Sequence, residues 1–132
     1  MYTQNNRIMV IDDDYSINNL IKFFLLKEGY KVDFFTDSID ALNYYRKDKY
    51  DLVLLDAKIP KLKEMSLYQK LKEIDSKVSI CFTNVDMDSL QEIKRQSPEM
   101  DNNIIPNSLS LDDQTRLDIL LLDNKDTIII KP

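Results

Sequence analysis

The chain alternates short apolar runs with longer stretches in which apolar residues recur at helical spacing. The runs that predict strands lie at residues 8–11, 32–35, 52–55 and 78–82, with a weaker fifth run at Ile104-Ile105. The stretches that predict helices lie at residues 15–28, 37–45, 64–74 and 86–93, with a last helix beginning at Ser110. Strands that alternate with helices favour a parallel sheet with helices on both faces. We therefore expect a doubly wound α/β domain with five strands.

The length of 132 residues fits one domain with a proper core. We expect residues 1–122 to form this domain and residues 123–132 to be a C-terminal tail. The tail holds one apolar patch, at residues 128–130, and is too short to be an output domain.

Composition and charge narrow the classes of function. The net charge is -5, and no cluster of Lys and Arg exceeds a few residues, which argues against direct DNA binding. The apolar runs are too short to span a membrane, and the polar N-terminus does not resemble a signal peptide. The single cysteine, Cys81, cannot form an internal disulfide, so we expect a cytoplasmic location.

Two residue types are informative because they are so rare. The chain has no histidine, which excludes phosphohistidine chemistry, histidine-activated nucleophiles and histidine-ligated metals. The one glycine, Gly29, excludes a glycine-rich phosphate loop. Any phosphate chemistry must therefore use carboxylates, hydroxyls, lysines and an ordinary backbone.

Carboxylates stand at the ends of two predicted strands. Asp12 and Asp13 follow the first strand, and Asp56 ends the third. With the strand order 2-1-3-4-5 these strands are neighbours, and ligands bind at the carboxyl ends of such sheets. Carboxylates gathered there suit Mg²⁺ or Mn²⁺. Thr83 ends the fourth strand at the same edge, so Asp56 could attack phosphorus while the Thr83 hydroxyl holds the product.

These residues resemble the receiver domain of two-component response regulators, most of all single-domain regulators of the chemotaxis type. The resemblance covers residues 7–122 and rests on three motifs, which are IMVIDDD at residues 8–14, DLVLLD at residues 51–56 with Pro60, and SICFT at residues 79–83. It implies a flavodoxin-like fold with the strand order 2-1-3-4-5.

The resemblance also implies roles for single residues. Asp56 would accept a phosphoryl group from a histidine kinase or a phosphotransfer protein. Asp12, Asp13, Asp56 and the backbone carbonyl of Lys58 would hold the metal ion. Thr83 would bind the phosphoryl group and move with it.

One departure from the family concerns a lysine. The family has a Lys-Pro pair just after the fifth strand. Matching residues 109–113 to the start of the family's last helix puts Asn107 at the lysine position, and a shifted register would put Pro106 there, so neither register supplies a lysine. The only Lys-Pro pair, Lys131-Pro132, stands far later in the sequence. Our hypothesis is that the side chain of Lys58 partly compensates.

Three functions remain open at this stage. The first is a stand-alone receiver that changes an unknown output partner when phosphorylated, with at most slow self-dephosphorylation and no other enzyme activity. The alternative is a pseudo-receiver that binds proteins independently of phosphorylation. A metal-dependent phosphohydrolase fits less well, because it would want a carboxylate two residues after Asp56, where Lys58 stands. The sequence also leaves a homodimer open.

Overall fold

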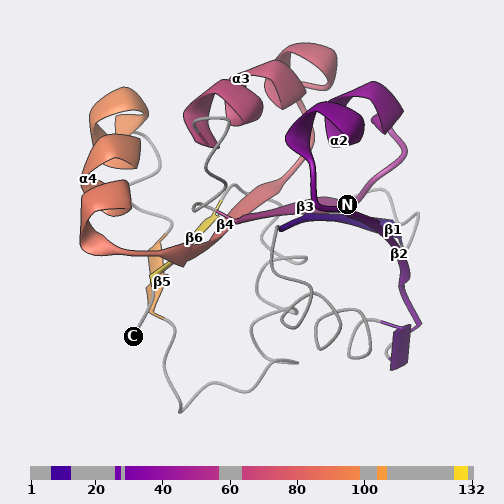
Figure 1. The fold of residues 1–132 in the computed structure, drawn as a ribbon, viewed down its shortest axis with the longest axis horizontal. Coiled ribbons are helices and arrows are strands. Elements are labelled where there is room, and N and C mark those ends of the chain that lie inside the picture. Colours follow the sequence, from indigo (N-terminus) through magenta and orange to yellow (C-terminus); the bar gives the residue numbers. More distant parts are fainter. Residues whose placement is uncertain are drawn as a thin grey trace.

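The computed structural model describes residues 7–12, 26–27, 29–56, 64–98, 104–106 and 127–130. Six strands form one parallel sheet in the order β2-β1-β3-β4-β6-β5. The strands are β1 (Arg7–Ile11), β2 (Lys31–Phe35), β3 (Leu52–Asp56), β4 (Ile80–Val85), β5 (Ile104–Pro106) and β6 (Thr127–Ile130). The helices are α2 (Ser38–Tyr44), α3 (Glu64–Ile74) and α4 (Met87–Gln96), and they lie together over one face of the sheet (Figure 1).

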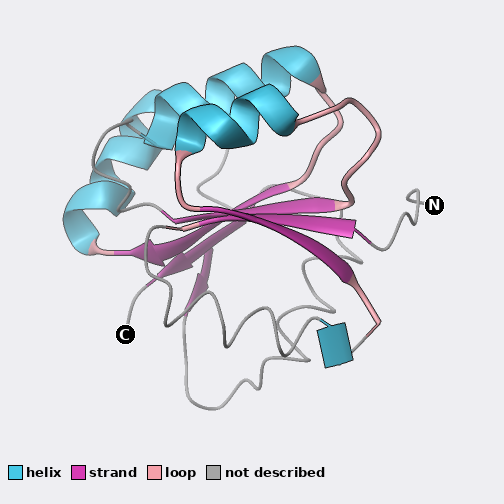
Figure 2. Cartoon of the chain, turned by 45° about the vertical axis from the view of Figure 1, so that its right-hand side comes forward, coloured by secondary structure: helices cyan, strands magenta, loops and turns pink. Residues whose placement is uncertain are grey.

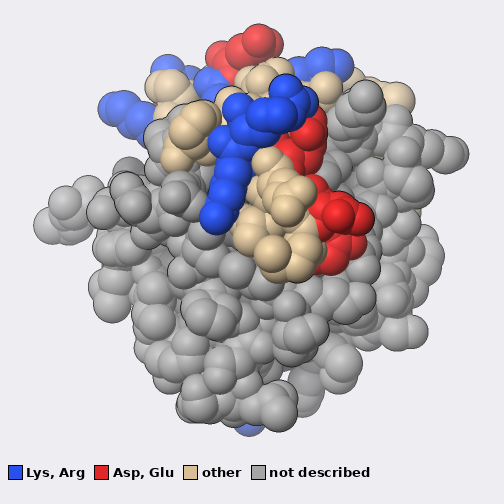
Figure 3. Space-filling model, turned by 90° about the vertical axis from the view of Figure 1, so that its left-hand side faces the viewer, with Lys and Arg blue, Asp and Glu red and all other residues tan. Residues whose placement is uncertain are grey.

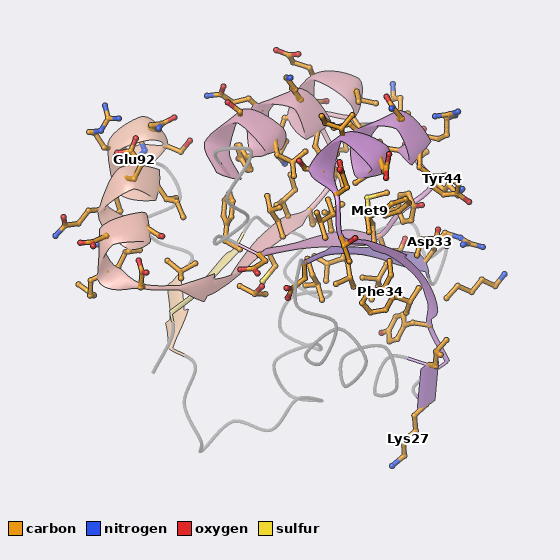
Figure 4. All side chains as sticks on the ribbon, in the orientation of Figure 1. Met9, Lys27, Asp33, Phe34, Tyr44 and Glu92 are labelled. Atoms are coloured by element: carbon orange, nitrogen blue, oxygen red, sulfur yellow. The ribbon has the colours of Figure 1, made fainter. Side chains whose placement is uncertain are left out.

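Side chains alternate between the two faces of the central strands. Met9 and Ile11 pack with residues of the three helices, while Ile8 and Val10 belong to a second buried cluster. Figure 4 shows Met9 on the side of the helices and Phe34 on the opposite side. Both clusters are buried, which explains why the central strands are almost continuously apolar.

Aspartates begin two of the helices. The Asp37 carboxylate accepts a hydrogen bond from the amide of Ile39 at 2.7 Å, and that of Asp86 accepts one from the amide of Ser89 at 2.8 Å. These side chains satisfy amides that have no partner inside the helix. Figure 2 shows the three helices as a layer above the twisted sheet.

Two buried tyrosines connect segments that lie far apart in the sequence. The rings of Tyr45 and Tyr50 stack with their centroids 5.4 Å apart. The Tyr45 hydroxyl donates to Asp75 at 3.0 Å, and the Tyr50 hydroxyl donates to Asp33 at 2.7 Å. Burial, together with the neighbouring carboxylates, raises the pKa of both tyrosines well above the ordinary range. Each phenol therefore stays protonated and serves as a hydrogen-bond donor.

The predicted fold class is confirmed, and most predicted elements are present. The order β2-β1-β3-β4 agrees with the expectation, and α3 has the predicted bounds of 64–74. The helix expected at residues 15–28 lies outside the described residues except for Leu26 and Lys27, and the helix expected from Ser110 lies outside them entirely.

The number of strands and the neighbour of β4 differ from the prediction. We expected residues 104–105 beside β4, but β6 holds that position and β5 pairs only with β6. All four residues of β6 are β-branched and therefore suit a strand with partners on both sides. Pro106 cannot donate a backbone hydrogen bond, and strands that contain proline are found at sheet edges. Residues 127–130 of the expected tail are thus part of the sheet.

Candidate functional site

Two aspartates lie at the carboxyl end of neighbouring strands. Ile11 of β1 pairs with Leu55 of β3, and one residue further along each strand come Asp12 and Asp56. The amide of Asp12 donates to the carbonyl of Phe35 in β2 at 3.0 Å, which fixes its backbone to the sheet. The structure therefore brings together two of the carboxylates that the sequence analysis singled out.

Thr83 stands opposite Asp56 on the next strand. The two residues are register partners in β3 and β4. Leu54 and Cys81, two residues before them, share the buried cluster on the face opposite the helices. Because side chains alternate along a strand, Asp56 and Thr83 project from this same face. The hydroxyl of Thr83 is thus on the correct side of the sheet to interact with a group on Asp56.

Both carboxylates are shielded from water. Asp56 is 2% exposed and Asp12 is 5% exposed, whereas Thr83 is half-buried. Ionised carboxylates at such depth need hydrogen bonds or a cation to offset the loss of hydration. Oxygen donors of this kind fit Mg²⁺ or Mn²⁺, and Asp12 and Asp56 are the described residues that could hold such an ion.

Other predicted site residues lie outside the described part of the chain. These are Asp13, Lys58, Pro60 and Asn107. Among the described residues, no group of three Asp, Glu, Cys or His side chains is arranged to hold a metal ion. The predicted third carboxylate of the set is Asp13, so the described residues contain only two of the three.

The strand order changes the analysis of the missing lysine. Asn107 was assigned to the lysine position with residues 104–105 as the fifth strand, beside β4, and residues 109–113 as the start of the last helix. Instead β6 is parallel to β4 and has its carboxyl end at the same edge as Asp56 and Thr83. Lys131, which itself lies outside the described residues, directly follows β6 in the sequence. The sequence analysis noted the Lys131-Pro132 pair but set it aside, because it stands far from residues 104–105, which were expected to form the last strand.

The register between β4 and β6 is interrupted beside Thr83. Phe82 pairs with Ile128 and Val85 pairs with Ile130, so two residues of β4 stand opposite one residue of β6. Such a β-bulge bends the strand and re-aims its side chains, and bulges are common next to functional sites. The irregular part of β4 therefore coincides with the candidate site.

The surface near α4 carries charges of both signs. Figure 3 shows this side of the molecule, where lysine and arginine side chains lie beside acidic ones. Arg95 pairs with Glu92 on α4. The described residues of this face form no single basic patch of the kind that binds nucleic acid. Among the described residues, no helix is both long and apolar enough to cross a membrane.

Comparison with known proteins gives a family. Residues 8–97 match the family model described as the response regulator receiver domain. Sporulation initiation phosphotransferase F of Bacillus subtilis is 33% identical over 92 residues, a match that covers 68% of this chain and 74% of that protein. Transcriptional regulatory protein DltR of Streptococcus agalactiae is 37% identical over 76 residues, which cover 58% of this chain but only 34% of that regulator.

Solved structures show the same fold. A response regulator receiver domain protein from Clostridium thermocellum superposes with a TM-score of 0.73 at 24% identity, covering 89% of this chain and 92% of that one. Response regulator TrrA from Thermotoga maritima, solved in complex with Mg²⁺ and BeF, gives a TM-score of 0.58 at 22% identity, with 96% and 86% covered. A further structure contains TrrA in complex with histidine kinase ThkA, with a TM-score of 0.59 at 21% identity and with 96% and 85% covered.

Proposed function

Because this chain belongs to the response regulator receiver domain family, we propose that Asp56 accepts a phosphoryl group and that this changes which protein the domain binds. The observation that carries the proposal is the position of Asp56. It is a buried carboxylate at the carboxyl end of β3, one strand from Asp12 and in register with Thr83. The same edge of the sheet is where ligands bind in folds of this type.

The chemistry is the transfer of a phosphoryl group to a carboxylate. An oxygen of Asp56 forms a bond to phosphorus while the bond from phosphorus to the donor breaks, and the product is an acyl phosphate. The Thr83 hydroxyl donates a hydrogen bond to a phosphoryl oxygen. Thr83 lies in β4, so its movement toward the phosphoryl group changes the strand that leads to α4.

A divalent cation fits the carboxylates of this edge. We propose that Asp12 and Asp56, with Asp13 and the carbonyl of Lys58, hold Mg²⁺ or Mn²⁺. When bound, the ion neutralises negative charge on the phosphoryl oxygens. The proposed donor is a histidine kinase or a phosphotransfer protein in the cytoplasm, and a neighbour of this fold was solved in complex with such a kinase.

We further propose that Lys131 supplies the cation that the family places after its fifth strand. β6 lies beside β4 in the position of that strand, and Lys131 is the next residue. The earlier hypothesis assigns the same role to Lys58, which follows β3 by two residues. A charge-assisted hydrogen bond to the phosphoryl group contributes roughly 1.5–3 kcal/mol, so the two assignments can be separated by experiment.

The first test measures the acceptor. The purified chain is incubated with acetyl phosphate and Mg²⁺, and its intact mass is recorded. We expect one added phosphoryl group, which is absent without Mg²⁺ and absent in Asp56→Ala. Asp40→Ala is the matched control, because Asp40 is an exposed residue of α2, which lies over the face of the sheet opposite to the one from which Asp56 projects, and it should be phosphorylated like the unchanged chain.

Binding of beryllofluoride provides the second readout. It mimics the phosphoryl group without a phosphoryl donor, so it still reports on the site if rapid hydrolysis removes the adduct. A chain that forms no adduct and binds no beryllofluoride with Mg²⁺ would contradict the proposed function. That result would favour the pseudo-receiver, which binds proteins independently of phosphorylation.

The lysine assignment is tested in the same assay. Lys131→Ala should weaken beryllofluoride binding by roughly 10- to 150-fold, which is the factor that corresponds to 1.5–3 kcal/mol. Lys58→Ala should then leave the affinity within about twofold. The reverse pattern would assign the cation to Lys58 and would contradict the role of Lys131.

A further inference from the structure

The sheet contains one strand more than the order 2-1-3-4-5 requires. Residues 97–126 separate α4 from β6, and the match to the family ends at residue 97. The described strand within this segment is β5, which pairs with the outer side of β6 through three register pairs. In Figure 1 β5 and β6 lie next to one another at the α4 end of the sheet. β5 therefore covers the edge that β6 would otherwise expose.

If β6 were the edge of the sheet, it would be prone to pair with strands of other molecules. Its four residues are all β-branched, and none carries a charge. Exposed strands with high β-propensity and no charge pair readily with strands of other chains. In a solution of the purified protein, the strand that β6 would meet is β6 of a second copy of the chain. A two-fold axis between two such edges would pair them antiparallel and join two sheets into one.

The outer edge of β5 is a much poorer template. The amides of successive residues in a strand point to opposite sides, so one side of β5 carries Ile105 and the other carries Ile104 and Pro106. Proline has no amide hydrogen. Whichever side faces outward, these three residues present a single N–H donor to an incoming strand. Short edge strands that contain proline are a known protection against edge-to-edge pairing.

We propose that β5 is a protective edge strand, which prevents β6 from pairing with the β6 strand of a second copy of this chain. The proposal concerns assembly and does not depend on phosphorylation at Asp56. It assigns a function to β5, which lies beyond the residues that match the family model. It also predicts where a dimer would form when the protection is removed.

The test removes β5 and measures the molar mass in solution. Residues 104–106 are replaced by Gly-Ser-Gly, which lacks the β-propensity needed to hold the strand. Light scattering after size exclusion, over a series of concentrations, should show a dimer whose dissociation constant is at least roughly tenfold lower than that of the unchanged chain. Ile74→Gly is the matched control, because it makes a similar change at a partly exposed helix end, and it should not alter the mass.

A second substitution tests the location of the contact. Adding Ile129→Lys to the variant that lacks β5 places a charge in the exposed edge strand and should restore the monomer. Ile105→Gly alone is the milder variant if the triple replacement prevents folding, and it should shift the equilibrium in the same direction. A folded variant that stays as monomeric as the unchanged chain would overturn the proposal. So would a dimer that Ile129→Lys leaves intact.

Discussion

The hydrogen bond between Tyr45 and Asp75 gives a prediction about stability that is independent of the functional site. Both side chains are buried, with 2% and 3% exposed. Replacing Tyr45 with Phe removes only the hydroxyl that lies 3.0 Å from the Asp75 carboxylate. The ring remains, so its stacking on Tyr50 is retained. The variant therefore isolates one hydrogen bond to a charged acceptor.

The expected cost follows from the other partners of Asp75. A hydrogen bond to a charged group contributes roughly 1.5–3 kcal/mol, and water cannot easily replace the hydroxyl at a buried site. The carboxylate still accepts the amides of Asp48 at 3.2 Å and Lys77 at 3.1 Å. Because two donors remain, we expect the lower part of that range, about 1.5–2 kcal/mol. This is a large share of the ~5–15 kcal/mol by which a domain is stable.

Urea unfolding at neutral pH measures this difference. The midpoint should fall while the slope stays unchanged, because the surface exposed on unfolding is the same. Tyr44→Phe is the matched control. Tyr44 is 45% exposed, and its contacts with Phe35 and Lys49 are made by the ring. Its loss of a hydroxyl should change stability by less than about 0.5 kcal/mol. Equal stability of the two variants would refute the reasoning.

Three further predictions concern pH and the core. Burial by itself would raise the pKa of Asp75, but hydrogen bonds from the amides of Asp48 and Lys77 and from the Tyr45 hydroxyl outweigh it and hold that pKa below its usual value. The stability that this carboxylate contributes is therefore present above about pH 4 and lost as the pH falls further, so Asp75→Asn should lose less stability than the unchanged chain across that range of acid unfolding. Burial and the nearby carboxylates raise the pKa of Tyr45 and Tyr50, so at least these two of the seven tyrosines should remain protonated in an alkaline absorbance titration until the chain unfolds. Ionisation of all seven tyrosines together near pH 10 in the folded state would contradict this. Phe82 is fully buried and stacks on Tyr68 at 5.6 Å, so Phe82→Ala should cost about 3–5 kcal/mol in the urea assay, and a loss below about 1 kcal/mol would show that the core collapses around the site.

The sequence predicted the parts of the fold that depend on short-range patterns. The ends of β1 and β3 were recognisable because an apolar run stops at an aspartate within the strand or one residue after it. The bounds of α3 followed from the spacing of its apolar residues. The convergence of Asp12, Asp56 and Thr83 followed from the parallel order of three neighbouring strands, which the structure has.

The parts that the sequence did not predict depend on pairing between distant residues. Residues 104–105 and 128–130 are both short isoleucine runs, and nothing local says which one pairs with β4. β6 is the longer of the two strands and has no proline, whereas β5 contains Pro106, so β6 is better suited to the position with partners on both sides. The contact between Tyr45 and Asp75 was missed for a similar reason, because thirty residues, including β3 and α3, separate the partners in the sequence.

The position of β6 also has a consequence for the order in which the chain can fold. β5 precedes β6 in the sequence, yet its pairing partner in the described sheet is β6. During synthesis β5 therefore leaves the ribosome before its native partner β6. Until residues 127–130 arrive, the open side of β4 is available to other strands. Late closure of a sheet by a distant segment slows folding and prolongs exposure of apolar edges. We expect this chain to need help from chaperones during synthesis more than receivers in which the strand beside β4 follows α4 directly.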